Sequence, residues 1–452
     1  MSDPAVKKAH ALTLDLRFSE ARTMLGTQQT IEAKYVGSLN DVLELLLTED
    51  PSLYNTYEQS FEERLFKNPK TPDEKFLLAE MNLQWAFVYL KFGHELDAAS
   101  HFRDAYKIAM ECRRKFPLYL PIRKTTGMLE VMVGAVPEKY NWVMDLFGIH
   151  GSIDNGLSDL AMIGSSQHEL AGEARLLKAM ISGYVLQQAA VSAAELDRQG
   201  ESDSSKALAL AAASLYIKSA QSEKAIPLLI PLRKVTPIVN YFLGEVLLQR
   251  GDYADAINSY KNFIKTYRGS NNLKDAWFKT GLCHLLLNDP TRADSTFAMA
   301  KEAGDDIVEA DRSAARTLST ELPSNIALIK VRYATDGGYY EKARLILDKV
   351  AQSELVRKKD KVEYFYRRAR LEHGTRHDDA ARLFYQQVID MAGTEPWYFA
   401  PNACLQMGYL FMQDGDQARA REFFKKALSY KNHEYKNSID SKAKTALNRM
   451  KK

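Results

Sequence analysis

With 452 residues, the chain is long enough for two to four globular domains or for one long repeat array. Hydrophobic residues make up 46% of it and charged residues 26%, a composition that excludes a largely disordered chain. The net charge of +3 provides no strong field that would attract nucleic acid or an anionic membrane. Gly and Pro are sparse, at 23 and 14 residues, which favours an all-α fold.

The cysteines and the apolar segments bear on the compartment. Cys112, Cys283 and Cys404 lie far apart and suit reduced thiols packed in helices better than a disulfide framework. No segment approaches 18 uninterrupted apolar residues, and the first residues contain no apolar leader core. We expect a cytoplasmic protein without a transmembrane segment. Two alternatives stay open, an exported or periplasmic protein whose leader has been removed and a peripheral association with a membrane.

The sequence of residues 1–160 predicts an irregular helical region that contains one recognisable helical hairpin at 79–112. In this hairpin, aromatic and small side chains take the offsets at which two antiparallel helices of a tetratricopeptide repeat pack closely. These residues are Trp85, Ala86, Tyr89, Ala98, Phe102 and Ala105.

Residues 161–236 predict long middle helices. The stretch ARLLKAMISGYVLQQAAVSAAEL carries apolar residues at helical spacing. The polar patch RQGESDSS at 198–205 is the best candidate for an exposed loop in this part of the chain.

Residues 237–452 predict an array of tetratricopeptide-type hairpins that ends in a capping helix. The clearest unit places Gly281 and Ala293 where two helices approach, with Trp277, Phe297 and Ala300 filling the seam. Two further units repeat this pattern, and degenerate copies surround Ala343, Ala369 and Ala381. The further units contain Leu243, Gly244, Leu247, Ala256, Tyr260 and Phe263, and then Met407, Gly408, Phe411, Ala420, Phe424 and Ala427.

Glycines at the predicted hairpin tips support this frame, because a helix often ends in a left-handed residue. They lie in Arg250-Gly251-Asp252, Asp336-Gly337-Gly338 and Asp414-Gly415-Asp416. The hairpins recur every 37 to 50 residues, more than the 34 of a regular array. The sequence therefore predicts an all-α, right-handed superhelical solenoid that is irregular in its N-terminal half.

Two short segments and the array that follows them resemble, in their order, the eukaryotic tetratricopeptide-repeat family that includes a yeast protein of the mitochondrial outer membrane implicated in clearing inclusion bodies. The matching residues are Phe18, Glu20 and Ala21, followed by Leu146, Phe147, Gly148, Gly151, Asp154, Gly156 and Leu157, and then by the array from about Pro237. Ile149 stands where the family usually has an aromatic residue, and Asp154 is displaced. The resemblance implies a helical scaffold without known catalysis, linked to membranes or protein quality control.

No pattern in the chain predicts a catalytic, cofactor or metal site. The Gly148, Gly151 and Gly156 run has neither a preceding strand nor a following Lys-Ser/Thr pair, so we interpret it as a packing turn. His373 and His377 are spaced as metal ligands, but they fall in a predicted turn and lack a third ligand. The basic and aromatic stretch Arg357 to Arg370 is the best nucleic-acid candidate, and we interpret it as a solvated helix face.

In a tetratricopeptide array, the first helix of each hairpin lines the concave groove. Counting the second, fifth, ninth and twelfth positions of these helices predicts a set of groove-facing residues. They are Phe87, Tyr241, Glu245, Gln249, Phe278, Arg332, Tyr366, Arg370, Tyr409 and Gln413. The alternative for the aromatic members is burial against neighbouring repeats.

Arg and aromatic side chains in a groove suit an extended peptide or a partner helix. The sequence therefore predicts a non-catalytic scaffold or adaptor that binds a protein partner in its groove, with no cofactor and no nucleic acid. The alternative is a structural subunit of a larger assembly, which could be associated with a membrane. The sequence predicts neither the partner nor the oligomeric state.

Overall fold

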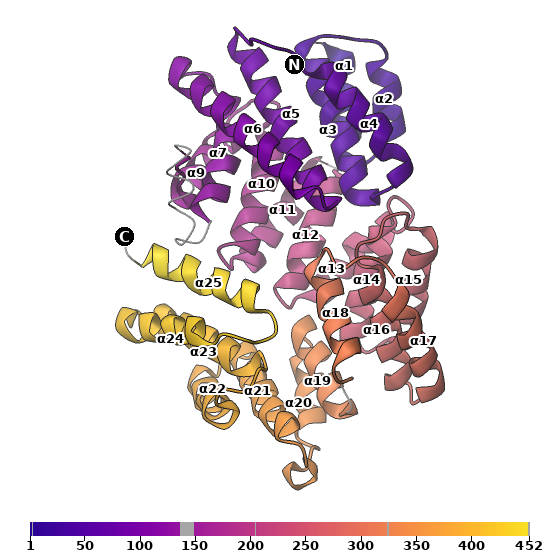
Figure 1. The fold of residues 1–452 in the computed structure, drawn as a ribbon, viewed down its shortest axis with the longest axis vertical. Helices are drawn as coiled ribbons and strands as arrows, with labels where there is room; N and C mark the ends of the chain where they lie inside the picture. The colour runs from indigo at the N-terminus through magenta and orange to yellow at the C-terminus, as the bar shows by residue number, and fades with distance from the viewer. Residues whose placement is uncertain (2, 136–148, 204, 323–324, 451–452) are drawn as a thin grey trace. The chain divides into compact units, whose positions relative to one another are not determined.

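The computed structural model describes residues 1, 3–135, 149–203, 205–322 and 325–450. Helices dominate the described residues and no strand occurs among them, which confirms the all-α prediction (Figure 1). The chain forms two compact units. Unit 1 comprises Met1–Tyr216, Pro227–Phe242 and Asn262–Asn271, and unit 2 comprises Ile217–Ile226, Leu243–Lys261 and Asn272–Lys452.

Unit 1 is built mainly from the helices of the first half of the chain. They are α1 (Pro4–Leu14), α2 (Phe18–Leu25), α3 (Ile31–Thr48), α4 (Pro51–Arg64), α5 (Pro72–Lys91), α6 (Glu95–Lys115), α7 (Ile122–Gly134), α9 (Ile153–Gly164), α10 (Ala171–Tyr184), α11 (Ala189–Asp203) and α12 (Lys206–Lys218). The helices α13 (Ser222–Leu229), α14 (Ile238–Arg250) and α15 (Tyr253–Thr266) contribute residues to both units, as does α12 through its last two residues, and the short 3-10 helix Ile230–Leu232 belongs to unit 1.

Unit 2 contains the remaining helices of the chain. They are α16 (Leu273–Leu286), α17 (Pro290–Glu302), α18 (Glu309–Ser319), α19 (Ile326–Gly337), α20 (Tyr340–Leu347), α21 (Lys358–Gly374), α22 (Asp378–Ala392), α23 (Phe399–Gln413), α24 (Gln417–Ser429) and α25 (Lys436–Arg449), with a 3-10 turn at Gln352–Glu354. The paired helices α16/α17, α19/α20, α21/α22 and α23/α24 pack together, and α19, α21 and α23 contact one another in turn.

Three glycines mark the tight helix crossings that the sequence predicts. A Cβ atom on Gly281 would lie 2.6 Å from the ring of Phe297, and one on Gly244 or Gly408 would lie 2.5 Å from the ring of Tyr260 or Phe424. Real Cβ atoms do not approach so closely, so these positions need a residue without a side chain. The aromatic ring of the second helix fills the space that each glycine leaves.

The predicted hairpin tips have the expected backbone. Gly251, Gly338 and Gly415 have φ angles of 90°, 84° and 81°, which lie in the left-handed region. Asp416 then caps the N-terminus of α24, because its side chain accepts a hydrogen bond from the Arg419 backbone N–H at 2.9 Å. The turn chemistry read from the sequence is therefore confirmed at these tips.

The predicted N-terminal hairpin corresponds to α5 and α6, and its core is aromatic. Trp85 is fully buried and stacks on Phe61 with ring centroids 4.7 Å apart. The capping box of Thr71 and Glu74 begins α5, since each side chain accepts a hydrogen bond from the backbone of the other.

A buried polar cluster crosses unit 1 and joins helices that are far apart in the sequence. The ammonium group of Lys124 on α7 lies 2.6 Å from Glu173 on α10, 2.8 Å from Glu80 on α5 and 2.7 Å from the Tyr35 hydroxyl on α3. Glu173 also lies 2.7 Å from His10 on α1. Burial alone would raise the pKa of Glu173, but Lys124 and His10 hold that pKa well below its ordinary value.

The structure corrects the sequence analysis in one segment and adds an unpredicted helix. The loop expected at 198–205 is helical over most of its length, because α11 continues to Asp203. In unit 2, the stretch between α17 and α19 contains α18, which the sequence analysis did not predict. None of the helices in the described part of the chain is long and apolar enough to cross a bilayer.

Candidate functional site

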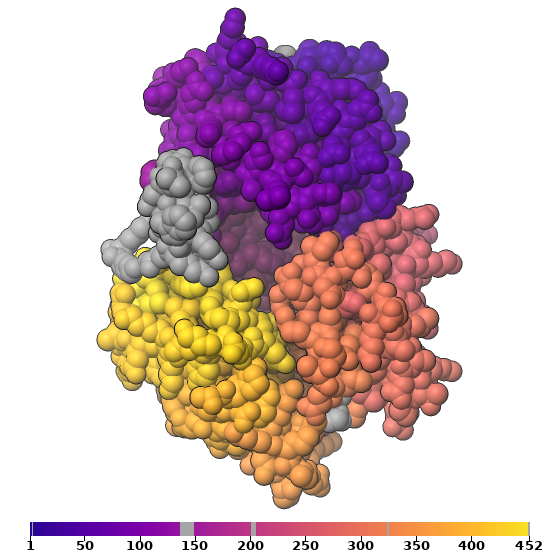
Figure 2. All heavy atoms as spheres, viewed as in Figure 1, coloured from indigo at the N-terminus to yellow at the C-terminus, as the bar shows by residue number. Residues whose placement is uncertain are grey.

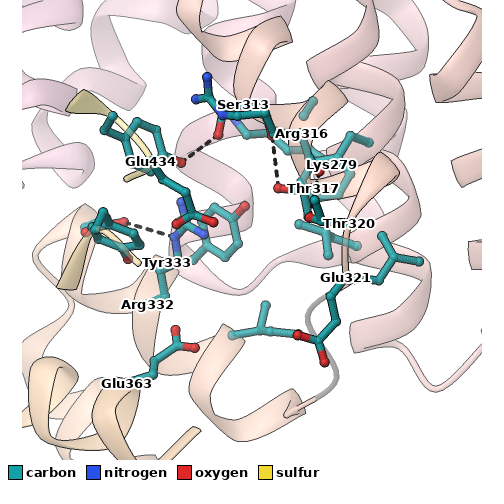
Figure 3. A pocket seen from close by; sticks show the side chains of 18 of the residues that line it. Lys279, Ser313, Arg316, Thr317, Thr320, Glu321, Arg332, Tyr333, Glu363 and Glu434 are labelled. Carbon is teal, nitrogen blue, oxygen red and sulfur yellow. Dashed lines mark hydrogen bonds and ion pairs between the residues drawn. The ribbon is translucent and has the colours of Figure 1, made fainter. Parts of the chain in front are cut away.

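A cavity of unit 2 has a volume of about 280 Å³ and lies between α18 and the first helices of successive hairpins (Figure 3). We call the lining residues of α14, α16, α19 and α21, together with Tyr398 and Phe399, the inner wall. It comprises Glu245, Gln249, Asp275, Phe278, Lys279, Leu282, Ile329, Arg332, Tyr333, Asp336, Lys359, Asp360, Glu363, Arg367, Tyr398 and Phe399. Helix α18 and the Glu434–Tyr435 dipeptide close the opposite side.

Helix α18 presents hydroxyl groups to the cavity and packs on α16 through another face. Ser313 and Thr317 of α18, and Thr320 directly after it, lie on the cavity side, across from Arg332 (Figure 3). The Ser313 hydroxyl is 2.7 Å from the hydroxyl of Tyr435. The buried residues of α18 are Asp311, Ala314 and Leu318.

Asp311 of α18 caps the N-terminus of α16. Its carboxylate accepts hydrogen bonds from the backbone N–H groups of Asn272 at 2.6 Å and Asp275 at 2.9 Å. Helix α16 has no side-chain cap of its own, because Asn272 adopts a left-handed conformation and its side chain makes no cap hydrogen bond. A carboxylate at this end also interacts favourably with the helix dipole. Burial raises the pKa of Asp311 to about 6, although the two N–H groups act in the opposite direction.

Arginine and tyrosine side chains form the middle of the inner wall. Arg367 is buried, donates to the Tyr398 hydroxyl at 2.8 Å and pairs with Glu363 at 2.6 Å. Arg332 is about one third exposed (34%), and the nearest carboxylate paired with it, that of Asp336, is 3.9 Å away. This long distance leaves the Arg332 guanidinium able to accept a closer anionic partner.

The ionic pairs of the inner wall satisfy most of its charges. Lys279 lies 2.7 Å from both Glu245 and Asp275. The hydroxyl of Tyr260 also donates to Glu245. Paired charges of both signs on one surface favour a partner with a complementary pattern over a purely acidic or basic one.

The structure brings together four of the ten residues predicted to face the groove. Glu245, Gln249, Phe278 and Arg332 line the cavity, while Phe87 and Tyr241 lie in unit 1. The other four, Tyr366, Arg370, Tyr409 and Gln413, lie in unit 2 away from the cavity lining.

Several of the predicted residues offer little surface to a partner. Tyr241 and Tyr366 are buried, and Tyr366 packs against Phe399 with ring centroids 5.3 Å apart. Gln249 is also buried, and its amide oxygen accepts a hydrogen bond from Ser222 at 2.5 Å. The assignment of the ten residues to a binding groove stays a prediction.

Residues that approach the cavity from other elements carry little signal in the sequence. Asp311, Ser313 and Thr317 belong to the unpredicted helix α18, and Tyr435 belongs to the connection before α25. Glu363 and Arg367 are spaced by four residues on α21, so their pairing on one face was the available signal.

The weaker chemical candidates take structural roles. The Nδ1 atom of His373 is hydrogen-bonded to the Tyr385 hydroxyl at 3.2 Å. The Nδ1 atom of His377 lies 2.9 Å from a carboxylate oxygen of Glu372. Among the described residues, no three His, Cys, Asp or Glu side chains are grouped to hold a metal. The three cysteines are free and buried, and burial raises the pKa of Cys112 to about 11 and that of Cys404 to about 12.

The glycine-rich segment before α9 is described only in part, since residues 136–148 lie outside the described residues. Gly148 is therefore not placed, and neither are Leu146 and Phe147 of the family resemblance. A Cβ atom on Gly156 would lie 2.4 Å from the carbonyl oxygen of Gly127, and one on Gly151 would lie 2.6 Å from that of Glu130. Both glycines therefore permit close packing on α7.

Sequence comparison identifies the repeats. Models of the tetratricopeptide repeat family match residues 210–271 and 241–306, and another matches residues 401–434. The chain therefore contains tetratricopeptide repeats, as the sequence analysis predicts. A comparison with curated proteins finds no matching sequence.

Solved structures of repeat proteins are similar to this chain at low sequence identity. The APC/C hetero-tetramer Cut9-Hcn1 matches at 12% identity with a TM-score of 0.30, over 95% of this chain and 87% of that chain. A tetratricopeptide repeat protein from Parabacteroides merdae matches at 14% identity with a TM-score of 0.24, over 82% and 98%. The human IFIT1 dimer with PPP-AAAA matches at 12% identity with a TM-score of 0.33, over 95% and 95%. At these values, the structures carry no argument about what this chain binds.

Proposed function

We propose that this tetratricopeptide-repeat chain is a non-catalytic scaffold that binds a peptide or helix of a protein partner on the inner wall of unit 2. The observation that carries the proposal is the convergence of first-helix residues from successive hairpins on one cavity. Glu245, Phe278, Arg332 and Glu363 come from α14, α16, α19 and α21. Tetratricopeptide repeats commonly use this surface to bind proteins.

The chemistry of the inner wall supports a peptide ligand. Tyr398 provides half-buried aromatic surface, Tyr333 and Phe278 line the cavity from buried positions, and Arg332 provides a charge without a close carboxylate of its own. Tyrosine and arginine are the residues that most often dominate binding energy at protein interfaces. The paired charges around them would select the register of a partner that presents its own charged groups.

Site-specific photocrosslinking tests the proposal even while the partner is unidentified. Benzoylphenylalanine at Tyr333 should capture peptides of a partner in cells that make the protein, because Tyr333 lies on the inner wall. The matched control is the same group at Leu383, which is 73% exposed on α22 and lies outside the cavity lining. Capture from Leu383 alone would favour the alternative, a structural subunit that uses its outer surface. Intrachain crosslinks alone from Tyr333 would contradict the groove proposal.

Substitution of Arg332 measures how much this side chain contributes to binding of the partner. Arg332→Ala should reduce capture of the crosslinked partner about fivefold or more, since an interface anchor contributes at least about 1 kcal/mol. Arg419→Ala is the control, because Arg419 is 61% exposed on α24 and its ionic partner is the nearby Asp416. Equal loss in both variants would indicate a nonspecific effect of charge.

The resemblance at Phe18, Glu20 and Ala21 adds a prediction about location. It favours a peripheral association with a membrane, or a role in protein quality control, as the alternative to a cytoplasmic protein without membrane contact. Fractionation of cells at low and high salt would test this location, because peripheral association through charged groups weakens as salt increases.

A further inference from the structure

Helix α18 is an additional helix between two repeat hairpins. It follows α16/α17 and precedes α19/α20, and it packs against α16, whose side chains belong to the inner wall. In Figure 2 the orange atoms of the segment that includes α18 lie on the face turned toward the viewer. The outer residues Arg312 and Ser319 of α18 are exposed. The helix therefore lies between the inner wall and solvent, where a partner would have to bind.

The docking of α18 depends on few contacts. Its buried residues are Asp311, Ala314 and Leu318, which are spaced by three and four positions and share one face. Its cavity face meets a void of about 280 Å³ instead of closely packed side chains. Segments with few buried apolar contacts open at a lower free energy than the closely packed core.

The contacts that hold α18 on α16 could be made by another helix. The N–H groups of Asn272 and Asp275 need a carboxylate, which Asp311 supplies. Ala314 allows close approach, and Leu318 provides the apolar contact. A helix with larger side chains than Ser313 and Thr317 on its cavity face would also fill the void, a contact that α18 does not make.

We propose that α18 is an intramolecular ligand that occupies the partner site of unit 2 and that an amphipathic helix of the partner displaces it. The partner helix presents an acidic residue, a small residue three positions later and a leucine-sized residue seven positions later, the spacing of Asp311, Ala314 and Leu318. This inference rests on the proposed function, since it assigns the ligand class and the regulation of the same surface. Because α18 is tethered, it competes at an effective concentration of the order of millimolar.

A peptide supplied in trans tests the displacement. The probe is a fluorescent synthetic peptide with the sequence of residues 305–322, and the released variant combines Asp311→Ala with Leu318→Ala. We expect the peptide to bind the released variant at least tenfold more tightly than the parent chain, whose site is occupied. The same peptide carrying both alanine substitutions should lose this binding. Equal binding of the intact peptide to parent and variant, or no binding to either, would overturn the proposal.

Hydrogen exchange of the parent chain provides a second test that needs no variant. The amides of α18 should exchange at least about 100-fold faster than those in the centres of α16 and α17, because α18 opens without them. Equal protection of the three helices would overturn the proposal, since α18 would then be a fixed part of the core. In the released variant, addition of the peptide should restore protection at Asn272 and Asp275.

The photocrosslinking experiment separates this inference from the proposed function. Capture of a partner from Tyr333 should increase at least tenfold in the released variant, because the competing helix has been removed. Equal capture in parent and variant would overturn the inference and leave the proposed function intact. Peptide binding without capture of any cellular partner would support the assignment of the surface and contradict the proposed function.

Discussion

Substitution of Gly281 by Ala should destabilise the α16/α17 hairpin even though alanine favours helix. The added Cβ atom would lie 2.6 Å from the ring of Phe297, so the ring must move by about 0.8 Å to reach an ordinary contact of 3.4 Å. Phe297 is 4% exposed and lies against Phe278, with ring centroids 5.7 Å apart, so it has little room to move. Overpacking of this kind costs about 2 kcal/mol, and the better helix propensity of alanine offsets about 1 kcal/mol.

Native-state hydrogen exchange of the α16 and α17 amides is the suitable assay, because it reports on one hairpin within a chain whose unfolding need not be two-state. A net loss of about 1 kcal/mol corresponds to an opening constant about fivefold larger. Phe297→Leu in the Gly281→Ala background should recover part of the loss, since a smaller side chain removes the clash. The recovery would appear as a coupling free energy in a double-mutant cycle.

The matched control is Gly172→Ala on α10. The nearest atom to a Cβ at Gly172 is the Arg175 Nη2 at 4.0 Å, so alanine meets no obstacle there. Here the helix propensity acts alone, and we expect stabilisation of up to about 1 kcal/mol. If Gly281→Ala stabilises its hairpin as Gly172→Ala does, the close-crossing explanation of the repeat glycines is wrong.

Two further predictions concern buried charges. The pKa of Asp311 is raised to about 6 in docked α18, so the docked state binds a proton more tightly than an undocked state with an ordinary aspartate pKa. Lowering the pH from 7 to 5 should therefore strengthen docking about tenfold, measured as intrinsic-rate-corrected exchange protection of α18. Asp311→Asn should abolish this change, and equal protection of the parent at both pH values would refute it. In unit 1, Lys124→Met removes the buried ammonium group that pairs with both Glu80 and Glu173 and should lower the free energy of unfolding by about 3–5 kcal/mol. Thermal denaturation should show a far smaller effect for Lys107→Met, which replaces an exposed lysine, and similar effects of the two substitutions would be evidence against a buried ionic cluster.

The pattern of small and aromatic residues was sufficient to predict the hairpins. Gly281 and Phe297 are close in sequence, and their contact depends only on the geometry of two adjacent helices. Local turn chemistry likewise predicted the left-handed Gly251 and Gly415. These features could be read from the chain because each hairpin carries its own packing information.

Helix α18 could not be predicted in the same way. Its sequence, EADRSAARTLS, contains few apolar residues, and the contact that positions it joins Asp311 to the backbone of Asn272, 39 residues earlier. The helical end of α11 was missed for a related reason, since polar residues such as those at 198–203 also form helix when the preceding turns are docked.

The candidate site was predicted in part. Counting positions along first helices found Glu245, Phe278 and Arg332, which line the cavity. The same count cannot show that Tyr366 is covered by Phe399, because that contact depends on the packing of the next hairpin. Nor can it find Tyr435, which approaches from outside the repeat frame.

The link between His10 and Glu173 has a consequence for the order in which the protein folds during synthesis. The two residues are separated by 163 positions, so α1 leaves the ribosome long before its polar ligand exists. At about 5–20 residues per second, this interval lasts roughly 8 to 30 s. Hairpins such as α23/α24 are complete within a few seconds of their first residue at the same rate. Helix α1 can pack on α2 and α3 as soon as those helices are translated, but His10 stays without its carboxylate partner until α10 has left the ribosome.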